Sequence, residues 1–277
     1  MRIAMTGAGG LVGSLILPVL RAAGHSVTAI SRDSGFRLGD APDLGGHEAL
    51  IHCAFAHRPG RYRGGEGDDP AGFRAANLDG SITLFEAAAA QEVTRILFLS
   101  SRAVQDGQPP GMLLTDDLPA CPADLYGEVK AGAEAHLAAL AGRGIATTAI
   151  RATGIYGPGP AQKWRTLFAE HLAGRPAGPR VSTELHGVDL ADAMLRLLAH
   201  PAPPRLVNAS DLILDRHDLL AALNASTGCM TPPPDRACGA ALRLPSCAAL
   251  ARMGWRPGGR ARLAATLPLL LDPAAHL

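Results

Sequence analysis

The fold is decided by residues 1–13, which read MRIAMTGAGGLVG. Arg2 to Thr6 alternate apolar and small side chains as a short buried strand does, and Leu11 to Ala23 reads as a helix. Three glycines at three-residue spacing lie where the strand enters the helix: Gly7, Gly10 and Gly13. Such a turn gathers free backbone N–H groups and the positive end of the helix dipole at one point, where a pyrophosphate can bind. The stretch therefore predicts a dinucleotide site.

This glycine spacing is G-x-x-G-x-x-G, so it meets the general dinucleotide pattern G-x-G-x-x-G only loosely. A glycine-rich turn that holds no ligand is the alternative. The position of the turn, at the start of the chain and directly after a strand, favours the dinucleotide site.

The second predicted strand, Ser26 to Ser31, bears on which dinucleotide is bound. In this kind of fold an acidic residue after the strand binds the 2′-hydroxyl of the adenosine ribose, whereas an arginine accommodates a 2′-phosphate. Arg32 follows the strand directly, and the first carboxylate comes only at Asp33. This order favours NADP over NAD, with a solvated loop charge as the other interpretation of Arg32.

The composition is that of a compact globular protein. The chain has 277 residues, of which 47% are hydrophobic and 18% charged, enough for one large or two unequal domains. The net charge is +1 and the basic residues form no long run, so neither nucleic acid nor an anionic membrane surface is an expected partner. No signal sequence precedes the first strand and no apolar run reaches the length of a membrane span, so we expect a soluble, cytoplasmic protein.

Cysteine and histidine usage indicates neither disulfides nor a metal site. Five cysteines, an odd number, lie far apart without a C-x-x-C pair, which fits reduced thiols: Cys53, Cys121, Cys229, Cys238 and Cys247. His52 and His57 come without a third ligand, so we expect packing or loop roles for both and no bound metal.

Further along the chain, apolar segments alternate with helical patterns, as in an α/β protein. Buried strands are expected at residues 49–54, 95–99 and 146–151, and helices at residues 73–90 and 123–142. Residues 33–46 are too short and broken for a full helix, so one crossover is trimmed. The glycine- and charge-rich stretch 57–72 follows a strand end, and both a mobile flap near the substrate and a plain surface loop remain open.

The pattern changes after Arg151. Short helices separated by proline-rich joints are expected at residues 163–173, 190–199 and 216–226, with a closing amphipathic helix at residues 261–271. We therefore predict a Rossmann-type doubly wound parallel sheet from residues 1–152 and 184–208, and a smaller C-terminal substrate-binding domain from residues 153–183 and 209–277.

Tyr126 and Lys130 are candidates for proton transfer. They are spaced i and i+4 on a predicted helix, so both side chains leave the same face. An ammonium group beside a phenol favours phenolate and lowers the tyrosine pKa from about 10, which lets the phenol exchange a proton with a substrate oxygen. A chance Tyr-x-x-x-Lys pair is the alternative, but the chain has only three tyrosines and two lysines.

Ser101 ends the strand that begins at Arg95, at the edge where active sites open. Its hydroxyl can hydrogen-bond a carbonyl oxygen as charge develops there. A helix-capping or turn serine is the alternative. A serine hydrolase fits poorly, because no G-x-S-x-G motif surrounds either Ser100 or Ser101.

Seven short motifs occur in a fixed order along nearly the whole chain. They are TGAGGLVG (6–13), NLDG (77–80), FLSSRAV (98–104), YGEVK (126–130), IYGPG (155–159), HGVDLADA (186–193) and MGWRP (253–257). Each motif alone is weak, but together they resemble the extended short-chain dehydrogenase/reductase family, the group that includes the NAD-dependent epimerase/dehydratase proteins.

The resemblance implies roles for individual residues. Tyr126 is the acid/base, Lys130 holds the nicotinamide ribose and tunes Tyr126, and Ser101 binds the carbonyl oxygen, while a hydride passes between a substrate carbon and the nicotinamide. The expected cofactor contacts are Gly7, Gly10, Leu11, Val12, Gly13, Ser31, Arg32, Asp40, Cys53, Ala54, Asn77, Tyr126 and Lys130. Family members are often dimers built on the helices that contain Asn77 and Tyr126, so a homodimer is expected.

Four departures from the family pattern narrow the choice of reaction. Arg102-Ala103 stands where dehydratases carry an acidic pair, which disfavours dehydration. Ser182 and Thr183 occupy the place of the arginine that binds a nucleotide-sugar diphosphate, and Arg180 is the nearest candidate. Gln105 replaces a tyrosine of the family, and the C-terminal domain is short. A smaller or non-nucleotide substrate is therefore favoured.

The leading hypothesis is an NADP-preferring dehydrogenase or reductase that acts on a secondary alcohol or ketone of a small molecule, such as a sugar or sugar acid. A nucleotide-sugar epimerase that retains NAD uses the same three residues and is the first alternative. A non-catalytic protein that senses NADP is the second, although it has no need of Ser101, Tyr126 and Lys130 together.

Overall fold

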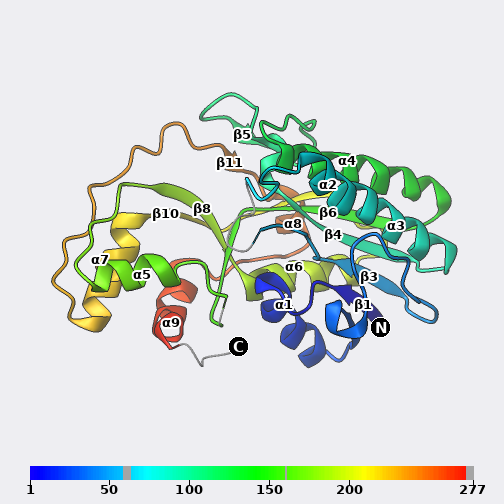
Figure 1. Cartoon of the computed structure of the whole chain (residues 1–277), viewed down its shortest axis with the longest axis horizontal. Coiled ribbons are helices and arrows are strands. Elements are labelled where there is room, and N and C mark those ends of the chain that lie inside the picture. Colours follow the sequence, from blue (N-terminus) through cyan, green and yellow to red (C-terminus); the bar gives the residue numbers. More distant parts are fainter. Residues whose placement is uncertain (59–63, 160, 273–277) are drawn as a thin grey trace.

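The structure, a computed structural model, describes residues 1–58, 64–159 and 161–272. A six-stranded parallel sheet forms its larger part, and a smaller unit lies beside it (Figure 1). The strand order is β2-β1-β3-β4-β6-β9, with bounds β1 Arg2–Thr6, β2 Ser26–Ile30, β3 Ala49–His52, β4 Arg95–Ser101, β6 Ala146–Ala152 and β9 Leu206–Ala209. The predicted Rossmann-type sheet is confirmed.

Helices cover both faces of this sheet (Figure 1). Helices α1 (Leu11–Ala22) and α6 (Gly187–Ala199) pack together on one face, and α3 (Gly80–Ala90) and α4 (Leu125–Leu140) cover the other. Within β4, Leu97 and Leu99 enter the core under α1 and α6, whereas Ile96 and Phe98 enter the core under α3 and α4. Because both faces are covered, the central strands read as continuous apolar runs.

The strand order reverses beside β1, since β2 pairs with one side of β1 and β3 with the other. Only a short 3-10 turn, η1 (Arg32–Ser34), lies between β2 and β3, which confirms the trimmed crossover. In open α/β sheets the crevice at such a reversal, outside the carboxyl ends of the strands, is where ligands bind.

The helix predicted over residues 73–90 consists of α2 (Pro70–Arg74), a π-helical turn η2 (Ala75–Asp79) and α3. It begins earlier than expected because Asp69 caps it, its Oδ1 accepting from the Gly72 N–H at 2.8 Å, with Pro70 in the first turn. Residues 70–72 of the predicted loop are therefore helical. Residues 59–63 of that loop lie outside the described residues, and its role as a flap stays a prediction.

The smaller unit contains strands that the sequence pattern did not predict. Its sheet has the order β10-β8-β7, formed by β7 (Gly154–Tyr156), β8 (Val181–His186) and β10 (Leu212–Asp215). These strands are short, and β8 carries Ser, Thr and Glu, so no clear apolar alternation marks it. The predicted boundary at residue 183 falls inside β8, and the division into domains stays a prediction.

The helices of the smaller unit were predicted closely. They are α5 (Arg165–Leu172), α7 (Arg216–Thr227) and α9 (Gly259–Leu271), and with β10 they enclose a third apolar core. Short elements complete the described chain: β5 (Leu113–Leu114) paired with β11 (Leu244–Pro245), α8 (Ala248–Arg252), and the 3-10 turns η3 (Arg102–Gln105) and η4 (Ala141–Arg143).

Two of the late motifs join the C-terminal segment to the large sheet. His186 caps α6, its Nδ1 accepting from the Val188 N–H at 3.1 Å, so α6 begins at Gly187. The Trp255 indole N–H donates to the carbonyl of Asp189 at 2.9 Å. The HGVDLADA and MGWRP motifs therefore serve the packing of α6. Across the ranges that the structure describes, no helix has the length and apolar character needed to cross a membrane.

Candidate active site

The glycine turn after β1 has no room for side chains. Gly7 has φ +73°, and a Cβ there would lie 2.6 Å from the backbone N of Ala54. A Cβ at Gly13 would overlap the carbonyl oxygen of Gly7. Among the residues that the structure describes, no side chain caps α1, whose N-cap residue is Gly10. The turn therefore brings the open N-terminus of α1 close to the end of β3, as a pyrophosphate site requires.

A cavity of about 730 Å³ opens at the carboxyl ends of β1, β2 and β3. This volume lies within the range of small-molecule and cofactor sites. Nine of the predicted cofactor contacts line it: Gly7, Gly10, Leu11, Val12, Gly13, Ser31, Arg32, Cys53 and Ala54. The lining also includes residues that the sequence did not single out for the cofactor, among them Phe36, Arg37, Phe55 and His57. Residues at the ends of three neighbouring strands therefore line one cavity.

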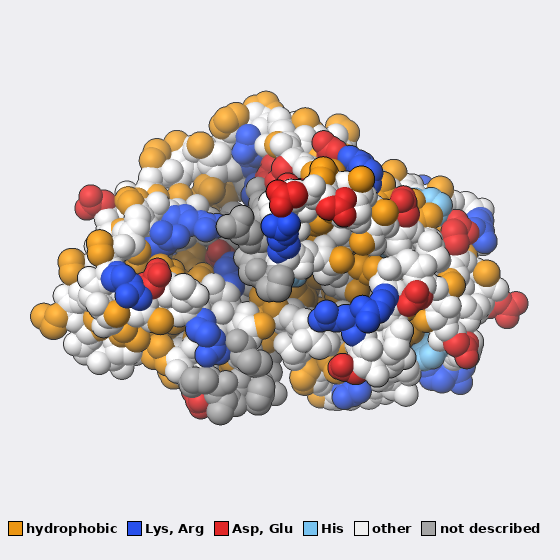
Figure 2. All heavy atoms as spheres, viewed as in Figure 1, with side chains coloured by type: hydrophobic (Ala, Val, Ile, Leu, Met, Phe, Trp, Pro, Cys, Tyr) orange, Lys and Arg blue, Asp and Glu red, His pale blue; other side chains and the backbone are white. Residues whose placement is uncertain are grey.

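Two arginines border the part of the cavity that follows β2. Arg32 and Arg37 are both exposed and both line it, together with Asp33. Figure 2 shows basic side chains bordering the hollows of this face of the molecule. Asp40 is not among the lining residues, and its Oδ2 accepts from the Arg37 N–H at 2.6 Å. A cofactor contact by Asp40 stays a prediction.

Asn77 is buried in the π-helical turn and holds the segment that follows β3. Its Nδ2 donates to the carbonyls of Ala56 (2.8 Å) and Phe73 (3.0 Å), and its Oδ1 accepts from the Ala56 N–H at 2.7 Å. Single π turns are frequent at functional sites. Asn77 thus supports the wall of the cavity through Ala56. Direct contact of Asn77 with a cofactor stays a prediction.

Ser101 and Tyr126 lie on segments that pack closely. The Ser101 Oγ accepts from the Ala103 N–H at 3.2 Å, so it caps the turn η3 and can still donate its own proton. Tyr126 is the second residue of α4, which Asp124 caps. A Cβ at Gly127 would lie 2.6 Å from the carbonyl oxygen of Ala103. Glycine at position 127 therefore lets the first turn of α4 approach the turn that follows Ser101.

Lys130 lies one turn further along α4 and is buried. Its Nζ donates to the carbonyl of Leu99 at 2.7 Å and lies 4.5 Å and 4.6 Å from the ring centroids of Phe55 and Phe98. Burial lowers the pKa of Lys130 to about 7. Because Leu99 precedes Ser101 by two residues, the three predicted catalytic residues gather at the carboxyl end of β4.

His52 has the packing role that its isolation in the sequence indicated. Its Nδ1 lies 2.7 Å from the Thr6 Oγ1 and its Nε2 lies 3.0 Å from the Ser81 Oγ, and both contacts are buried. Burial lowers the pKa of His52 to about 3, so the ring is neutral. No cluster of three His, Cys, Asp or Glu side chains suited to a metal ion occurs among residues 1–58, 64–159 and 161–272.

A buried ion pair beneath the site was not predicted from the sequence. Arg151 at the end of β6 donates to Glu134 of α4, with Nη2 2.7 Å from Oε2, and Nη1 donates to the carbonyl of Leu118 at 2.9 Å. Ser100 also donates to Glu134. The pair fixes the helix of Tyr126 and Lys130 to the sheet. Its only sequence signal is the spacing of Glu134 four residues after Lys130, on the same helix face.

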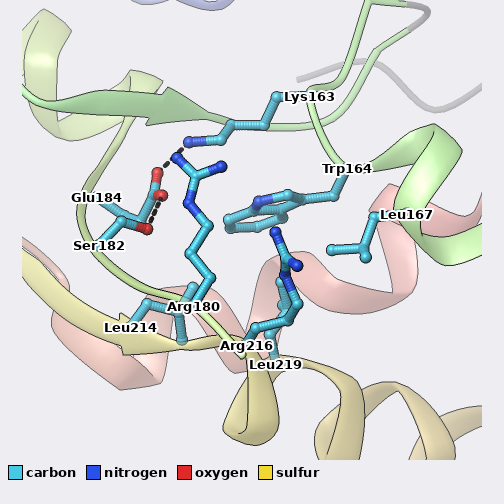
Figure 3. Close-up of a pocket in the computed structure, with 9 residues that line it drawn as sticks. All are labelled: Lys163, Trp164, Leu167, Arg180, Ser182, Glu184, Leu214, Arg216 and Leu219. Carbon is cyan, nitrogen blue, oxygen red and sulfur yellow. Dashed lines mark hydrogen bonds and ion pairs between the residues drawn. The ribbon is translucent and has the colours of Figure 1, made fainter. Parts of the chain in front are cut away.

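A second pocket, of about 160 Å³, lies in the smaller unit between α5, β8 and β10. Figure 3 shows the side chains of Lys163, Arg180 and Arg216 converging around Trp164. Lys163 forms an ion pair with Glu184, which also accepts from Ser182 at 2.9 Å. Since this pair neutralises itself, the two guanidinium groups leave the pocket positively charged.

The second pocket lies close to the carboxyl ends of β4 and β6. A Cβ at Gly154 would lie 2.6 Å from the Lys163 Nζ, so the ion pair of the pocket sits against the first residue of β7. Gly154 follows Ala152 by two residues, and Ala152 pairs with Ser101 in the large sheet. Burial and the neighbouring Arg180 lower the pKa of Arg216, as expected where two cations share a confined space.

Comparison with known proteins agrees with this architecture. The model of the NAD dependent epimerase/dehydratase family matches residues 3–210. A UDP-glucose 4-epimerase of Corynebacterium glutamicum is 30% identical over 179 residues, which are 57% of this chain and 53% of that protein. The chain therefore matches about half the length of this relative.

Solved structures share the fold over nearly the whole chain. UDP-glucose 4-epimerase of Thermotoga maritima with UDP-glucose has a TM-score of 0.81 at 19% identity, with 99% of this chain and 98% of that chain covered. The dTDP-glucose 4,6-dehydratase DesIV of Streptomyces venezuelae, solved with NAD, has a TM-score of 0.80 at 20% identity, with 97% and 96% covered. At these identities the likeness is one of fold.

Proposed function

The chain belongs to the NAD-dependent epimerase/dehydratase family, and within it we propose an NAD(P)-dependent oxidoreductase that acts on a secondary alcohol or ketone. The observation that carries the proposal is the placement of Tyr126 and Lys130 beside the strand that ends in Ser101, with a large cavity on the neighbouring strand ends. When bound, the nicotinamide would supply a hydride acceptor or donor.

The three side chains divide the work at the substrate oxygen. The Tyr126 phenol exchanges a proton with it, and the positive charge of Lys130 stabilises the phenolate. The Ser101 hydroxyl, which accepts from the Ala103 N–H, keeps its proton and donates a hydrogen bond to the same oxygen as negative charge develops there. Ser101 supplies its group from the end of β4, and Tyr126 and Lys130 supply theirs from α4, which packs against that strand.

The cavity fits a dinucleotide, and NADP is the cofactor that we favour. The cradle of Gly7 and Gly13 and the uncapped N-terminus of α1 suit the pyrophosphate. Arg32 and Arg37 suit a 2′-phosphate, which NAD does not carry. Lys130 would bind the nicotinamide ribose through its N–H groups.

The second pocket supports a substrate that carries an anionic group. At about 160 Å³ it is smaller than the pockets that enclose a whole ligand, so it suits a carboxylate or phosphate rather than a complete nucleotide. Arg180 and Arg216 supply the donors for such a group. A sugar acid or sugar phosphate with its reacting carbon at Tyr126 is the substrate class that we propose.

The proposal is tested with Tyr126→Phe. We expect turnover with NADPH or NADP to fall by a factor of about 10² to 10⁴, because the phenol is the proton carrier, while NADPH binding falls far less, because the other expected cofactor contacts are kept. Turnover is measured in a screen of sugar acids, sugar phosphates and ketones, and binding by NADPH fluorescence. Activity retained in Tyr126→Phe would exclude the mechanism.

A nucleotide-sugar epimerase with retained NAD is the second candidate, favoured by the 30% identity to a UDP-glucose 4-epimerase. The two are separated by desalting the purified protein, denaturing it and identifying the released cofactor by mass spectrometry. A stoichiometric NAD indicates the epimerase. Empty protein that binds NADPH more tightly than NADH indicates an oxidoreductase with an exchanging cofactor.

A further inference from the structure

Phe55 contacts both residues of the proposed proton-transfer pair. Its ring centroid lies 5.1 Å from that of Tyr126, edge to face at 77°, and 4.5 Å from the Lys130 Nζ. Phe55 also lines the cofactor cavity, three residues after β3 ends at His52. One aromatic ring therefore touches the phenol, the ammonium group and the cavity.

The ring is held in place from several sides. Asn77 binds both the N–H and the carbonyl of the next residue, Ala56, at 2.7 Å and 2.8 Å, which fixes the backbone beside Phe55. The Phe73 ring packs against Phe55 edge to face, with centroids 5.5 Å apart. Because backbone and ring are both constrained, Phe55 can in turn constrain what it touches.

The surroundings of Lys130 make its contact with the Phe55 ring strongly stabilising. The ammonium group is buried, with the carbonyl of Leu99 as a hydrogen-bond acceptor and aromatic rings on two sides, Phe55 and Phe98. A cation over an aromatic face is stabilised most when it is removed from water. The other groups around it are the neutral His52, the Cys53 thiol and the Glu134 carboxylate, and Tyr126 lies one turn earlier on the same helix.

We propose that Phe55 is a positioning residue. Its ring holds the Lys130 ammonium group and the Tyr126 phenol side by side and stabilises the charged form of Lys130 beside the phenol. The inference rests on the proposed function for its catalytic meaning. The contact itself can be measured without turnover, because Lys130 and Lys163 are the two lysines of the chain.

The test follows the titration of Lys130 by NMR in protein labelled with ¹³C at the lysine side chains, without cofactor. In Phe55→Leu we expect the Lys130 midpoint to move to lower pH by roughly 0.5 to 1 unit, because the ammonium loses one aromatic face while burial is retained. Phe55→Tyr keeps the face and should titrate as wild type. Phe55→Met, also without a π face, is measured beside Phe55→Leu and should shift in the same direction.

Phe73→Leu is the matched control, since Phe73 contacts Phe55 and is buried like a core residue. We expect it to lower the melting temperature and to move the Lys130 midpoint much less than Phe55→Leu does, because Phe55 keeps its aromatic face and the backbone beside it stays bound to Asn77, while Lys163 titrates alike in every variant. An unchanged Lys130 midpoint in Phe55→Leu overturns the proposal, as does an equal shift in Phe73→Leu or the failure of both Phe55→Leu and Phe55→Met to fold.

In the active enzyme the same variants should move the pH profile. A lower Lys130 pKa makes the ammonium lose its proton earlier as pH rises, so the falling limb of kcat for Phe55→Leu shifts to lower pH, and Phe55→Tyr restores it. The two proposals fail separately. A protein with the expected NMR shift but no turnover contradicts the proposed function, whereas normal turnover with an unmoved Lys130 contradicts the role of Phe55.

Discussion

The cavity beside the glycine turn and the pocket of the smaller unit are built from different materials. The cavity is shaped by backbone, because three strands end at one edge and Gly7 and Gly13 leave no space for a Cβ. The second pocket is shaped by long side chains, Lys163, Arg180 and Arg216, from segments far apart in the chain. A site shaped by backbone requires that no Cβ atom fills the turn. A site shaped by side chains can change its ligand specificity through a single substitution.

This difference predicts that the largest loss comes from adding a single carbon to the turn. In Gly13→Ala the new Cβ overlaps the carbonyl oxygen of Gly7, so the turn must move away from its pyrophosphate-binding shape. We expect NADPH affinity, measured by fluorescence titration, to fall roughly 100-fold, which corresponds to about 3 kcal/mol.

Gly9→Ala is the matched control in the same turn: Gly9 also lines the cavity, but among the described residues no atom lies within 4 Å of a Cβ at that position, so the turn can keep its shape. It should bind NADPH within about two-fold of wild type. Equal losses of NADPH affinity in Gly9→Ala and Gly13→Ala would show that any side chain in the turn impairs binding. The contrast between a site shaped by backbone and one shaped by side chains would then be wrong.

Removing one positive charge from the second pocket should weaken anion binding there without affecting cofactor binding in the cavity. In Arg216→Gln we expect the dissociation constant of inorganic phosphate, measured by titration calorimetry, to rise about 10-fold, because one charge-assisted donor is lost. NADPH affinity should stay the same. Arg236→Gln removes an exposed arginine of the same unit that pairs with Asp218 and does not line the pocket.

Arg236→Gln should therefore leave phosphate binding unchanged. Loss of phosphate binding in both variants would indicate a general effect of net charge rather than a site. If UDP binds far more tightly than phosphate and loses affinity in Arg216→Gln, the pocket belongs to a nucleotide, and the epimerase becomes the better function.

The same contrast explains how much could be predicted from the sequence. The large sheet, the glycine turn and the Tyr126–Lys130 spacing follow from local periodicity, which the structure retains. From the second pocket the sequence singled out Arg180 as a candidate for an anionic group but gave no sign of Arg216, because β8 and β10 bring the two together by pairing segments with no apolar alternation. Phe55 gave no signal either, since its partners lie on α4, far along the chain.

The buried pair of Glu134 and Arg151 shows a third kind of limit. Each residue lies on a correctly predicted element, α4 and β6, yet a charged residue in a sequence is most often a surface residue. Only the packing of the helix on the sheet shows that the two charges meet in the interior. Local pattern thus predicted these two elements, but only the contact between them shows what their charged side chains do.

The smallest expected effect lies at the edge of the cavity, where backbone and side chains both take part. Arg32 and Arg37 are exposed, so each contributes little to 2′-phosphate binding, and Arg37→Ser should lower the ratio of NADPH to NADH affinity only about three- to five-fold. The double variant with Arg32→Ser should lower it about 10-fold, since two weak contacts add. Asp33→Asn is the informative control, because a carboxylate there would bind the 2′-hydroxyl of NAD. If Asp33→Asn weakens NADH binding while the arginine variants leave the ratio unchanged, NAD is the cofactor, and Arg32 is the solvated loop charge that its sequence position also allowed.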